Sequence, residues 1–352
     1  MPITILTGIV VLSVILLVHE LGHFTTAKAT GVRVEEFGLG FPPRLLSFKR
    51  GETRYSLNAI PFGGFNKLTG EEDPADPRSL AGKSRGVRLL VLSGGSLMNF
   101  LLALVLFSTS YLIPREVIIG QVMVEEVVLN SPADMAGIRT GDIILQVNNK
   151  PVGNNNELHQ HIIENLGKNT ILLIQHPDST RESIQLVPRW EPPEGEGAIG
   201  IAMTTINPTT VIRRYPFWQV IPLGAARVIE TVVLWVDGLA SMFTGKVEAA
   251  LFGPVGIAQL TGEVAQFGII PLLEIAALIS LVLGIMNLFP LPAIDGGRIT
   301  FLFLELIRRG KRISPKTEGM VHLVGLAMLM LFLFAITYQD IMRLISGESL
   351  IP

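Results

Sequence analysis

The sequence predicts a polytopic α-helical membrane protein with about four transmembrane helices, a β-loop on the cytoplasmic side and one inserted extracytoplasmic α+β domain. Of its 352 residues, 49% are hydrophobic and only 16% are charged, and the mean hydropathy is +0.49. That composition is too apolar for an ordinary soluble domain and fits a chain with several membrane spans and a soluble portion. The net charge of −2 gives no indication of nucleic-acid binding. The absence of cysteine excludes disulfides and thiolate metal ligands.

Four apolar segments are predicted to cross the bilayer, because each approaches the roughly 20 residues that span its hydrocarbon core. They are residues 3–27, 87–113, 271–289 and 319–338. A further apolar segment, 216–243, is interrupted by charges at Arg227, Glu230 and Asp237. We therefore expect it to form an amphipathic helix at the membrane interface. A fifth span is the alternative interpretation of that segment.

The basic residues predict how these segments are oriented, because short loops rich in Lys and Arg stay in the cytoplasm. The loops 28–86 and 298–316 are both rich in Lys and Arg, and we expect both on the cytoplasmic side. Both termini and the loop 114–215 are then expected on the opposite side. The predicted domains are 1–113, with the first two spans and the β-loop at about 36–66; 114–205, the outer domain; 206–250, the interfacial region; and 251–352, with the last two spans.

The outer loop has the pattern of a small α+β domain. Residues 127–152 contain a Gly-Asp turn before a β-branched strand, 155–167 have a helical period, and 169–188 are typical of a hairpin. The segment "SPADMAGIRTGDIILQVNNKPV" in this loop resembles a bacterial, circularly permuted PDZ domain, which a strand at 197–203 would close. A generic small α+β domain is the alternative. Gly38–Phe41 also matches a PDZ signature loop, but no PDZ body follows it, so that match is given no weight.

His19, Glu20 and His23 form the pentapeptide His-Glu-Leu-Gly-His within the first apolar segment. On a helix, residues four apart lie on one face, about 6 Å apart along the axis. Two such imidazoles can bind one zinc ion at about 2.0 Å, with Glu20 as the general base for a zinc-bound water. The alternative is that the polar residues anchor the cytoplasmic end of a helix. The pentapeptide alone does not decide between the two, because a zinc site needs a third ligand.

The best candidate for the third ligand is Asp295 in "NLFPLPAIDGG" (287–297), where prolines end the fourth apolar segment on the cytoplasmic side. We expect Asp295 in an unwound, glycine-flanked stretch at the depth of His23, where irregular backbone must be buried by protein or line a cavity. A simple turn at Asp295–Gly297 is the alternative. His322 is a second, isolated candidate. The remaining histidines fall in the outer domain and are expected at its surface: His159, His161 and His176.

These features together resemble the site-2 protease family of intramembrane metalloproteases (peptidase family M50), and most closely its bacterial RIP zinc metalloprotease (RseP-type) branch. The resemblance rests on HExxH in the first span, the outer PDZ-like domain and the pattern N-x-x-P-x-P-x-x-D-G on a later span. Similar segments occur at 60–74, 94–100 and 253–257, so it extends over nearly the whole chain. This sequence has a single PDZ domain, where some members have two, and Ser96, where many members have proline. Neither departure touches the predicted metal site.

The resemblance implies a zinc site of three ligands and one base. His19, His23 and Asp295 would hold one Zn²⁺ per chain, and Glu20 would activate the water. The implied activity is hydrolysis of peptide bonds in or near transmembrane segments, with substrates such as an anti-sigma factor or a remnant signal peptide. The protein would lie in the bacterial inner membrane, with the active site near the cytoplasmic face and the PDZ domain outside.

The resemblance also implies residues that bind the substrate. Asn287 would hold the substrate backbone, and Pro290 and Pro292 would shape the segment around it. Asn99 would face the site from the second span, although a helix–helix hydrogen bond behind small residues is an equal alternative for it. Residues 36–66 would form a membrane-embedded β-loop whose edge adds a strand to an unwound substrate.

The expected partners are transmembrane protein or peptide substrates, the lipid bilayer and a peptide C-terminus in the PDZ groove, whose domain would gate access. A membrane-anchored PDZ scaffold or chaperone without proteolytic activity is the alternative function, but it has no use for HExxH with an aspartate at the same depth. A zinc transporter would need metal-binding residues along a path through both membrane halves, and the outer halves of the predicted spans contain none.

Overall fold

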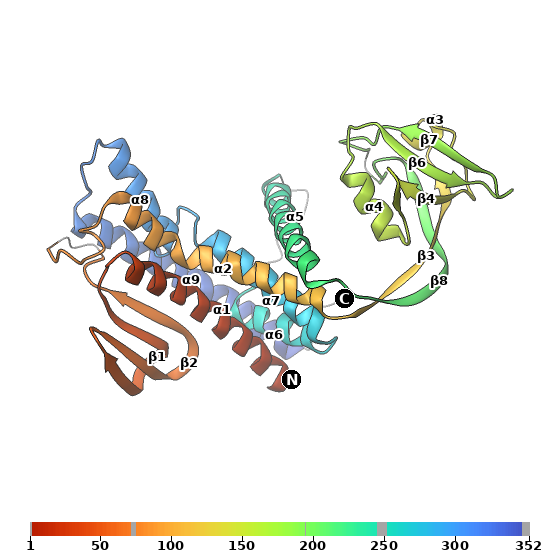
Figure 1. The fold of residues 1–352 in the computed structure, drawn as a ribbon. Coiled ribbons are helices and arrows are strands. Elements are labelled where there is room, and N and C mark those ends of the chain that lie inside the picture. Colours follow the sequence, from red (N-terminus) through yellow and green to blue (C-terminus); the bar gives the residue numbers. More distant parts are fainter. Residues whose placement is uncertain (1, 72–74, 194, 245–251, 347–352) are drawn as a thin grey trace. The chain divides into compact units, whose positions relative to one another are not determined.

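The computed structural model describes residues 2–71, 75–193, 195–244 and 252–346. The chain divides into two compact units, one made of Met1–Ile113 and Tyr215–Pro352 and the other of Pro114–Arg214. The first unit is mainly helical and the second is mainly β-structure (Figure 1). Each unit has a hydrophobic core of its own.

Helix α2 is the centre of the first unit, because it packs against α1, α5, α7 and α8. Small residues allow this close packing, since a methyl group on Gly22 of α1 would overlap the backbone of Gly94 of α2. The helices of this unit are α1 (Pro2–Ala29), α2 (Arg85–Leu112), α5 (Phe217–Phe243), α6 (Pro254–Ala265), α7 (Ile269–Met286), α8 (Asp295–Ile307) and α9 (Pro315–Ser346).

Five of these helices are long and apolar enough to cross a membrane: α1, α2, α5, α7 and α9. Four of them correspond to the predicted spans. The fifth, α5, is the segment predicted to lie along the interface, so the predicted number of four spans is not confirmed. Its charges are partly compensated within the helix, because Arg227 forms an ion pair with Glu230 at 2.8 Å.

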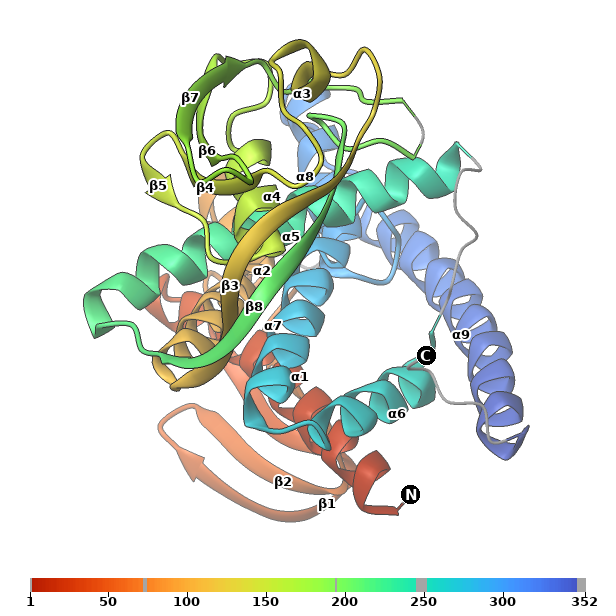
Figure 2. The ribbon, with the colours of Figure 1, turned by 90° about the vertical axis from the view of Figure 1, so that its right-hand side faces the viewer.

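The segment between α1 and α2 contains a long antiparallel hairpin of β1 (Val34–Arg50) and β2 (Thr53–Leu68). Gly51 makes the turn with a positive φ of 62°, a conformation that favours glycine. Near the turn the rings of Phe48 and Tyr55 stack with centroids 5.2 Å apart. Strand β2 packs against α1, as Figure 2 also shows, and this contact brings the hairpin next to His-Glu-Leu-Gly-His.

The second unit is built on an antiparallel sheet with the strand order β7-β6-β4-β3-β8, to which the short β5 adds beside β4. Its core consists of aliphatic side chains from the sheet and from α4, among them Val122, Ile144, Leu158 and Leu172, all at most 1% exposed. Its elements are β3 (Arg115–Val127), α3 (Pro132–Met135), β4 (Ile143–Val147), β5 (Lys150–Pro151), α4 (Asn155–Ile163), β6 (Thr170–Gln175), β7 (Arg181–Leu186) and β8 (Ile201–Arg213).

The closing strand of this unit differs from the one predicted at 197–203. Strand β8 begins only at Ile201, because Gly200 before it has a φ of 74° and interrupts the extended backbone. It then continues to Arg213, which pairs with Arg115 at the start of β3. The compact unit therefore extends past residue 205, where the sequence placed the end of the outer domain.

Candidate metal centre

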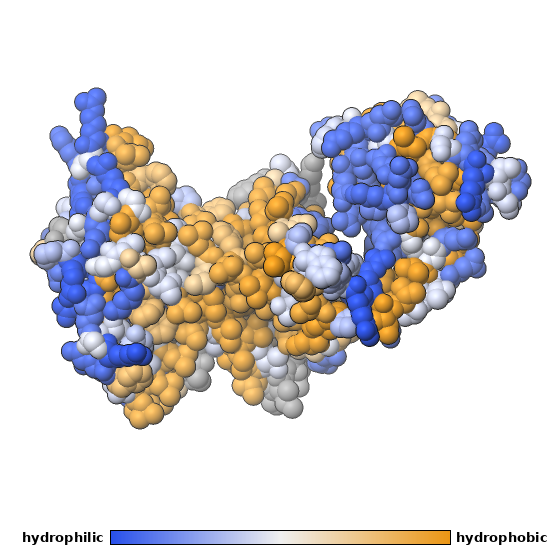
Figure 3. All heavy atoms as spheres, viewed as in Figure 1, coloured by the Kyte–Doolittle hydropathy of each residue, from blue (hydrophilic) through white to orange (hydrophobic). Residues whose placement is uncertain are grey.

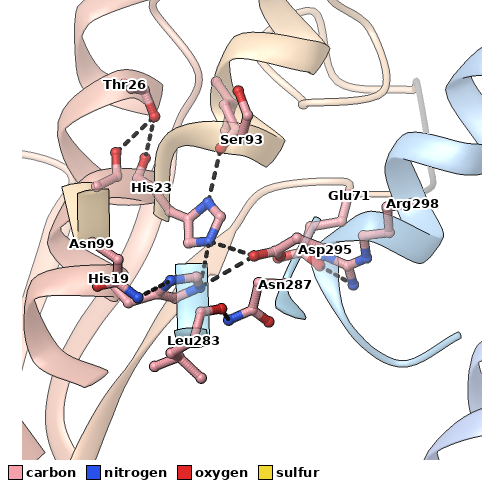
Figure 4. A network of polar contacts seen from close by, with 12 residues as sticks. His19, His23, Thr26, Glu71, Ser93, Asn99, Leu283, Asn287, Asp295 and Arg298 are labelled. Carbon is pink, nitrogen blue, oxygen red and sulfur yellow. Dashed lines mark hydrogen bonds and ion pairs between the residues drawn. The ribbon is translucent and has the colours of Figure 1, made fainter. Parts of the chain in front are cut away.

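Two histidines of α1 and one aspartate of α8 meet in the first unit (Figure 4). The Nε2 atoms of His19 and His23 are 3.2 Å apart, and each lies 3.1 Å from Oδ2 of Asp295. Among the described residues this is the one group of at least three His, Cys, Asp or Glu side chains whose ligand atoms converge in this way. Two imidazole nitrogens and one carboxylate oxygen around one point form the ligand set of an open, catalytic zinc site.

Asp295 reaches this position as the first residue of a helix, which corrects the expectation of an unwound stretch. The irregular segment runs from the end of α7 to Ile294, and α8 begins at Asp295. Gly296 and Gly297 are helical and do not form a turn. A methyl group on either glycine would overlap the backbone of the preceding loop, so their small size allows α8 to fold back on it. A carboxylate in the first turn of a helix is also favoured by the helix dipole.

Helix α2 forms the wall behind both imidazoles. The Nδ1–H of His23 donates to the carbonyl oxygen of Val91 at 2.8 Å, which leaves Nε2 to bind a metal. Gly95 makes the space, since a Cβ at this position would lie 2.5 Å from Cε1 of His19 and 2.5 Å from Nε2 of His23. The sequence analysis predicted neither the hydrogen bond to Val91 nor the space at Gly95. The glycine pair Gly94–Gly95 was its one indication of close helix packing.

Asn99 of α2 holds the other histidine. It is fully buried, its Nδ2 lies 3.3 Å from Nδ1 of His19, and its Oδ1 has no hydrogen-bond partner in the described part of the chain. When the amide is turned by half a turn, Oδ1 accepts the Nδ1–H of His19 and becomes satisfied. In that arrangement Nε2 of His19 carries a lone pair toward Asp295. The buried amide oxygen therefore fits a metal-binding tautomer of His19.

Glu20 lines the same cavity as the three ligands, a hollow of about 330 Å³. Asn287 lines it too, and its Nδ2 donates to the carbonyl oxygen of Leu283 at 3.1 Å. Asn99, Pro290 and Pro292 are absent from the described cavity wall. The structure thus brings Asn287 and Glu20 to the ligands, whereas Asn99 lies behind His19 and the two prolines lie in the loop between α7 and α8.

Helix α9 supports the loop that leads to Asp295. Nδ1 of His322 accepts the backbone N–H of Ala293 at 3.0 Å, and Ala293 has a positive φ of 78°. One turn further along α9, a methyl group on Gly325 would overlap Pro292. His322, the second candidate ligand of the sequence, is therefore a contact of this loop and stands outside the ligand group in the described residues.

An ion pair that the sequence analysis did not predict lies on the cavity wall. Arg298 follows Asp295 by one helical turn and pairs with Glu71 at 2.6 Å. Both residues line the cavity, and Arg298 is its one Lys or Arg among the described lining residues. The pair ties α8 to the chain that follows the β1–β2 hairpin (Figure 4).

Comparison with known proteins agrees with this site. The family model described as Peptidase family M50 matches residues 7–332. A Clostridium acetobutylicum protein named "Putative zinc metalloprotease" is 36% identical, over 96% of this chain and 97% of its own length. The zinc metalloprotease RasP of Oceanobacillus iheyensis is 28% identical over 97% of this chain and 99% of its own. The regulator of sigma-W protease RasP of Bacillus subtilis is 27% identical over the same shares. The family resemblance predicted from the motifs is confirmed: the chain belongs to peptidase family M50.

Proposed function

We propose that this protein is an intramembrane zinc metalloprotease, which hydrolyses peptide bonds in or near the transmembrane segments of membrane-protein substrates. The observation that carries the proposal is the convergence of three ligand atoms within 3.2 Å on the wall of a cavity that Glu20 also lines. Membership of family M50 and five helices able to cross a membrane support a bacterial membrane protease.

Zinc is the cofactor, in line with the names of the M50 relatives. His19, His23 and Asp295 would hold it through two nitrogen atoms and one oxygen atom, which leaves a fourth position for water or substrate. When bound, the ion polarises the scissile carbonyl and lowers the pKa of water to about 7. Val91 and Asn99 keep the two imidazoles in the tautomer that this ligand set needs.

The proton transfers of the hydrolysis are assigned to a side chain of the protein itself. Glu20 takes a proton from the attacking water and delivers it to the leaving amine, a role that contributes about 10²–10⁴-fold to such reactions. Strand β2 lies close to this side chain. A methyl group on Gly64 would be only 3.9 Å from Cγ of Glu20. Asn287 keeps one amide contact with Leu283 and offers its remaining polar atoms to the substrate backbone.

The β1–β2 hairpin is the proposed device that receives an unwound substrate. A transmembrane helix bonds every amide internally, so its scissile carbonyl is shielded until the helix opens. Residues 36–39 of β1 pair with 64–67 of β2 on one side and with 54–57 of β2 on the other. In the described residues, the edges to which an extended segment can add are therefore those of 64–68 and 46–50. Leu45, Leu46 and Phe48 near its end are 62–68% exposed, which suits contact with lipid.

The second unit is proposed to be an extracytoplasmic PDZ-like domain that restricts access to the site, with the metal centre near the cytoplasmic face. Its strand β8 is an edge strand that contacts α4, and a groove between a strand edge and a helix is what a PDZ domain uses to bind a peptide. The Bacillus subtilis relative is named a regulator of sigma-W protease, which favours an anti-sigma-factor type of substrate here. Deletion of residues 118–203 should release cleavage of intact, untrimmed substrate; unchanged cleavage would contradict the gating role.

The experiment that tests the proposal separates zinc binding from turnover. Glu20→Gln should keep the zinc content of the purified protein and reduce proteolysis of a model transmembrane substrate by at least about 10²–10⁴-fold. Asp295→Ala should lose both zinc and turnover. Glu125→Gln in the second unit is the matched control, because Glu125 is exposed. Undiminished proteolysis by Glu20→Gln, or full zinc content in Asp295→Ala, would refute the mechanism.

A further inference from the structure

Asn66 of β2 lines the cavity of the metal centre, yet its side chain makes no hydrogen bond. Both Nδ2 and Oδ1 are buried, and neither has a hydrogen-bond partner in the part of the chain that the structure describes. Two other polar side chains that line the cavity do have partners. The ring of His23 donates to Val91, and the amide of Asn287 donates to Leu283.

A buried amide without partners is costly for the folded protein. Native structures pair the large majority of buried polar atoms, and an unpaired one costs about 1–3 kcal/mol. A leucine has nearly the shape of asparagine and would fill the same space without that cost. The presence of Asn66 at this position is therefore explained when another molecule supplies the missing hydrogen bonds.

The chemistry of the carboxamide indicates what that molecule is. Nδ2 donates and Oδ1 accepts, side by side and without net charge, which matches the C=O and N–H of a peptide backbone. A substrate helix that unwinds in the cavity gives up its internal hydrogen bonds in a setting of low polarity, where each unpaired group is expensive. The unwound substrate backbone and the side chain of Asn66 each need a hydrogen-bond donor and an acceptor, and each can supply them to the other.

We propose that Asn66 binds the backbone C=O and N–H of a substrate residue next to the scissile bond. This inference rests on the proposed protease function, because Asn66 shares its cavity with Glu20 and Asp295. Asn66 contacts the peptide group of the substrate and not its side chains. It therefore favours unwound over helical backbone and gives little preference for particular substrate residues. Its place on β2 makes it an extension of the hairpin edge into the catalytic cavity.

Two zinc-binding probes of different size test this role on the full-length, zinc-loaded protein in detergent. Acetohydroxamic acid binds zinc without offering a peptide group, whereas the hydroxamate of acetyl-dileucine offers two. Asn66→Leu should raise the Kd of the dipeptide hydroxamate by about tenfold or more, the loss of one or two hydrogen bonds. The Kd of acetohydroxamic acid and the zinc content should not change. The Tm of the probe-free protein should stay equal or rise, because an unpaired buried amide has been removed.

Asn169→Leu is the matched control, since Asn169 is exposed in the second unit and should leave both probes unaffected. A second measurement does not depend on the folding of any variant. Replacing the peptide N–H groups of the dipeptide probe one at a time by an ester oxygen should weaken its binding to the unaltered protein at one position, and that loss should vanish in Asn66→Ala.

The outcomes are distinct. Equal binding of the dipeptide probe by Asn66→Leu and by the unaltered protein, or equal weakening of both probes, would overturn the role of Asn66 and leave the zinc site intact. Failure of the unaltered protein to bind either hydroxamate would refute the proposed function itself, and the inference with it.

Discussion

The two units of the molecule differ in how much of their apolar side-chain surface is exposed. The second unit buries large aliphatic residues such as Leu172 and Ile174, both 0% exposed. The first unit has a hydrophobic core too, but it also buries polar residues such as Asn99 and Ser280, both 0% exposed, while Leu331 and Phe334 of α9 are 73% exposed. On the face drawn in Figure 3, hydrophobic residues cover the helices of the first unit, whereas the second unit presents many hydrophilic ones.

This difference is expected when one unit folds in water and the other in lipid. In water, burial of apolar surface drives folding, so a soluble unit hides its aliphatic side chains. In lipid, apolar surface gains nothing from burial, and helices associate through close packing of small residues and through polar contacts. A buried histidine pair in the first unit is thus placed by the same polar contacts that hold its helices together. The site and the fold of that unit depend on one set of residues.

The largest expected effect comes from the small residues that form the metal site. Gly95→Ala places a methyl group against both imidazoles, because a Cβ there lies 2.5 Å from each ring. Zinc should be lost, and turnover should fall by about 10⁴-fold or more, since the activated water is lost with it. Zinc content after dialysis against a competing chelator measures the effect. Gly86→Ala on the same helix, where a Cβ would meet nothing within 4 Å, is the matched control. Retained zinc in Gly95→Ala would show that α2 can move away.

The second test contrasts a buried leucine of the second unit with an exposed leucine of the first. Leu172→Ala removes a fully buried side chain of the second unit and should lower its free energy of unfolding by about 2–5 kcal/mol. Leu331→Ala shortens a side chain that is 73% exposed on α9 and should change the stability of the detergent-solubilised protein very little. Hydrogen exchange of the full chain measures the stability of each unit separately. Similar losses in the two variants would contradict the expectation that the exposed leucines of α9 contribute little to stability.

A smaller effect is expected at the loop before Asp295. His322→Gln removes the acceptor that Nδ1 offers to Ala293, and zinc affinity should fall by about tenfold, as for other supporting residues of metal sites. His322→Asn places an amide oxygen near the position of Nδ1 and should restore most of the affinity. His159→Gln, an exposed histidine of the second unit, controls for the substitution. Equal losses in the Gln and Asn variants would assign the effect to packing.

The smallest effect concerns pH and the second unit alone. Hydrogen bonds to Asp142 and then Glu182 hold the pKa of His176 above its usual value of 6.5. A raised pKa means that this stabilisation is complete below about pH 6.5 and is lost as the pH rises through the folded-state value. The protection factors for hydrogen exchange within residues 114–214, which are corrected for the intrinsic effect of pH on exchange, should therefore fall slightly over that range, and His176→Asn should flatten the trend. An equal pH trend in His176→Asn would exclude His176 as its source.

The sequence predicted much of this protein because the informative signals are local. Hydrophobic runs of sufficient length gave the helices that can cross a membrane, and the spacing of His19, Glu20 and His23 on one helix predicted a metal site before its third ligand was known. The turn and strand pattern of residues 127–188 predicted the order of strands and helix in most of the second unit. Such features depend on residues that are near each other in the chain.

Tertiary structure alone decided the partners of these residues. Val91, Asn99 and Asp295 contact the histidines from 68, 80 and 276 residues away in the sequence. Neither the clearance at Gly95 nor the unpaired amide of Asn66 has a signature in the order of residues, because both arise where separate elements approach each other. The sequence by itself determined which chemistry the chain carries and which segments are apolar. The packing of helices around small residues decided how the ligands are oriented and which polar groups face the cavity, since in an apolar interior every such group is placed by its neighbours in space.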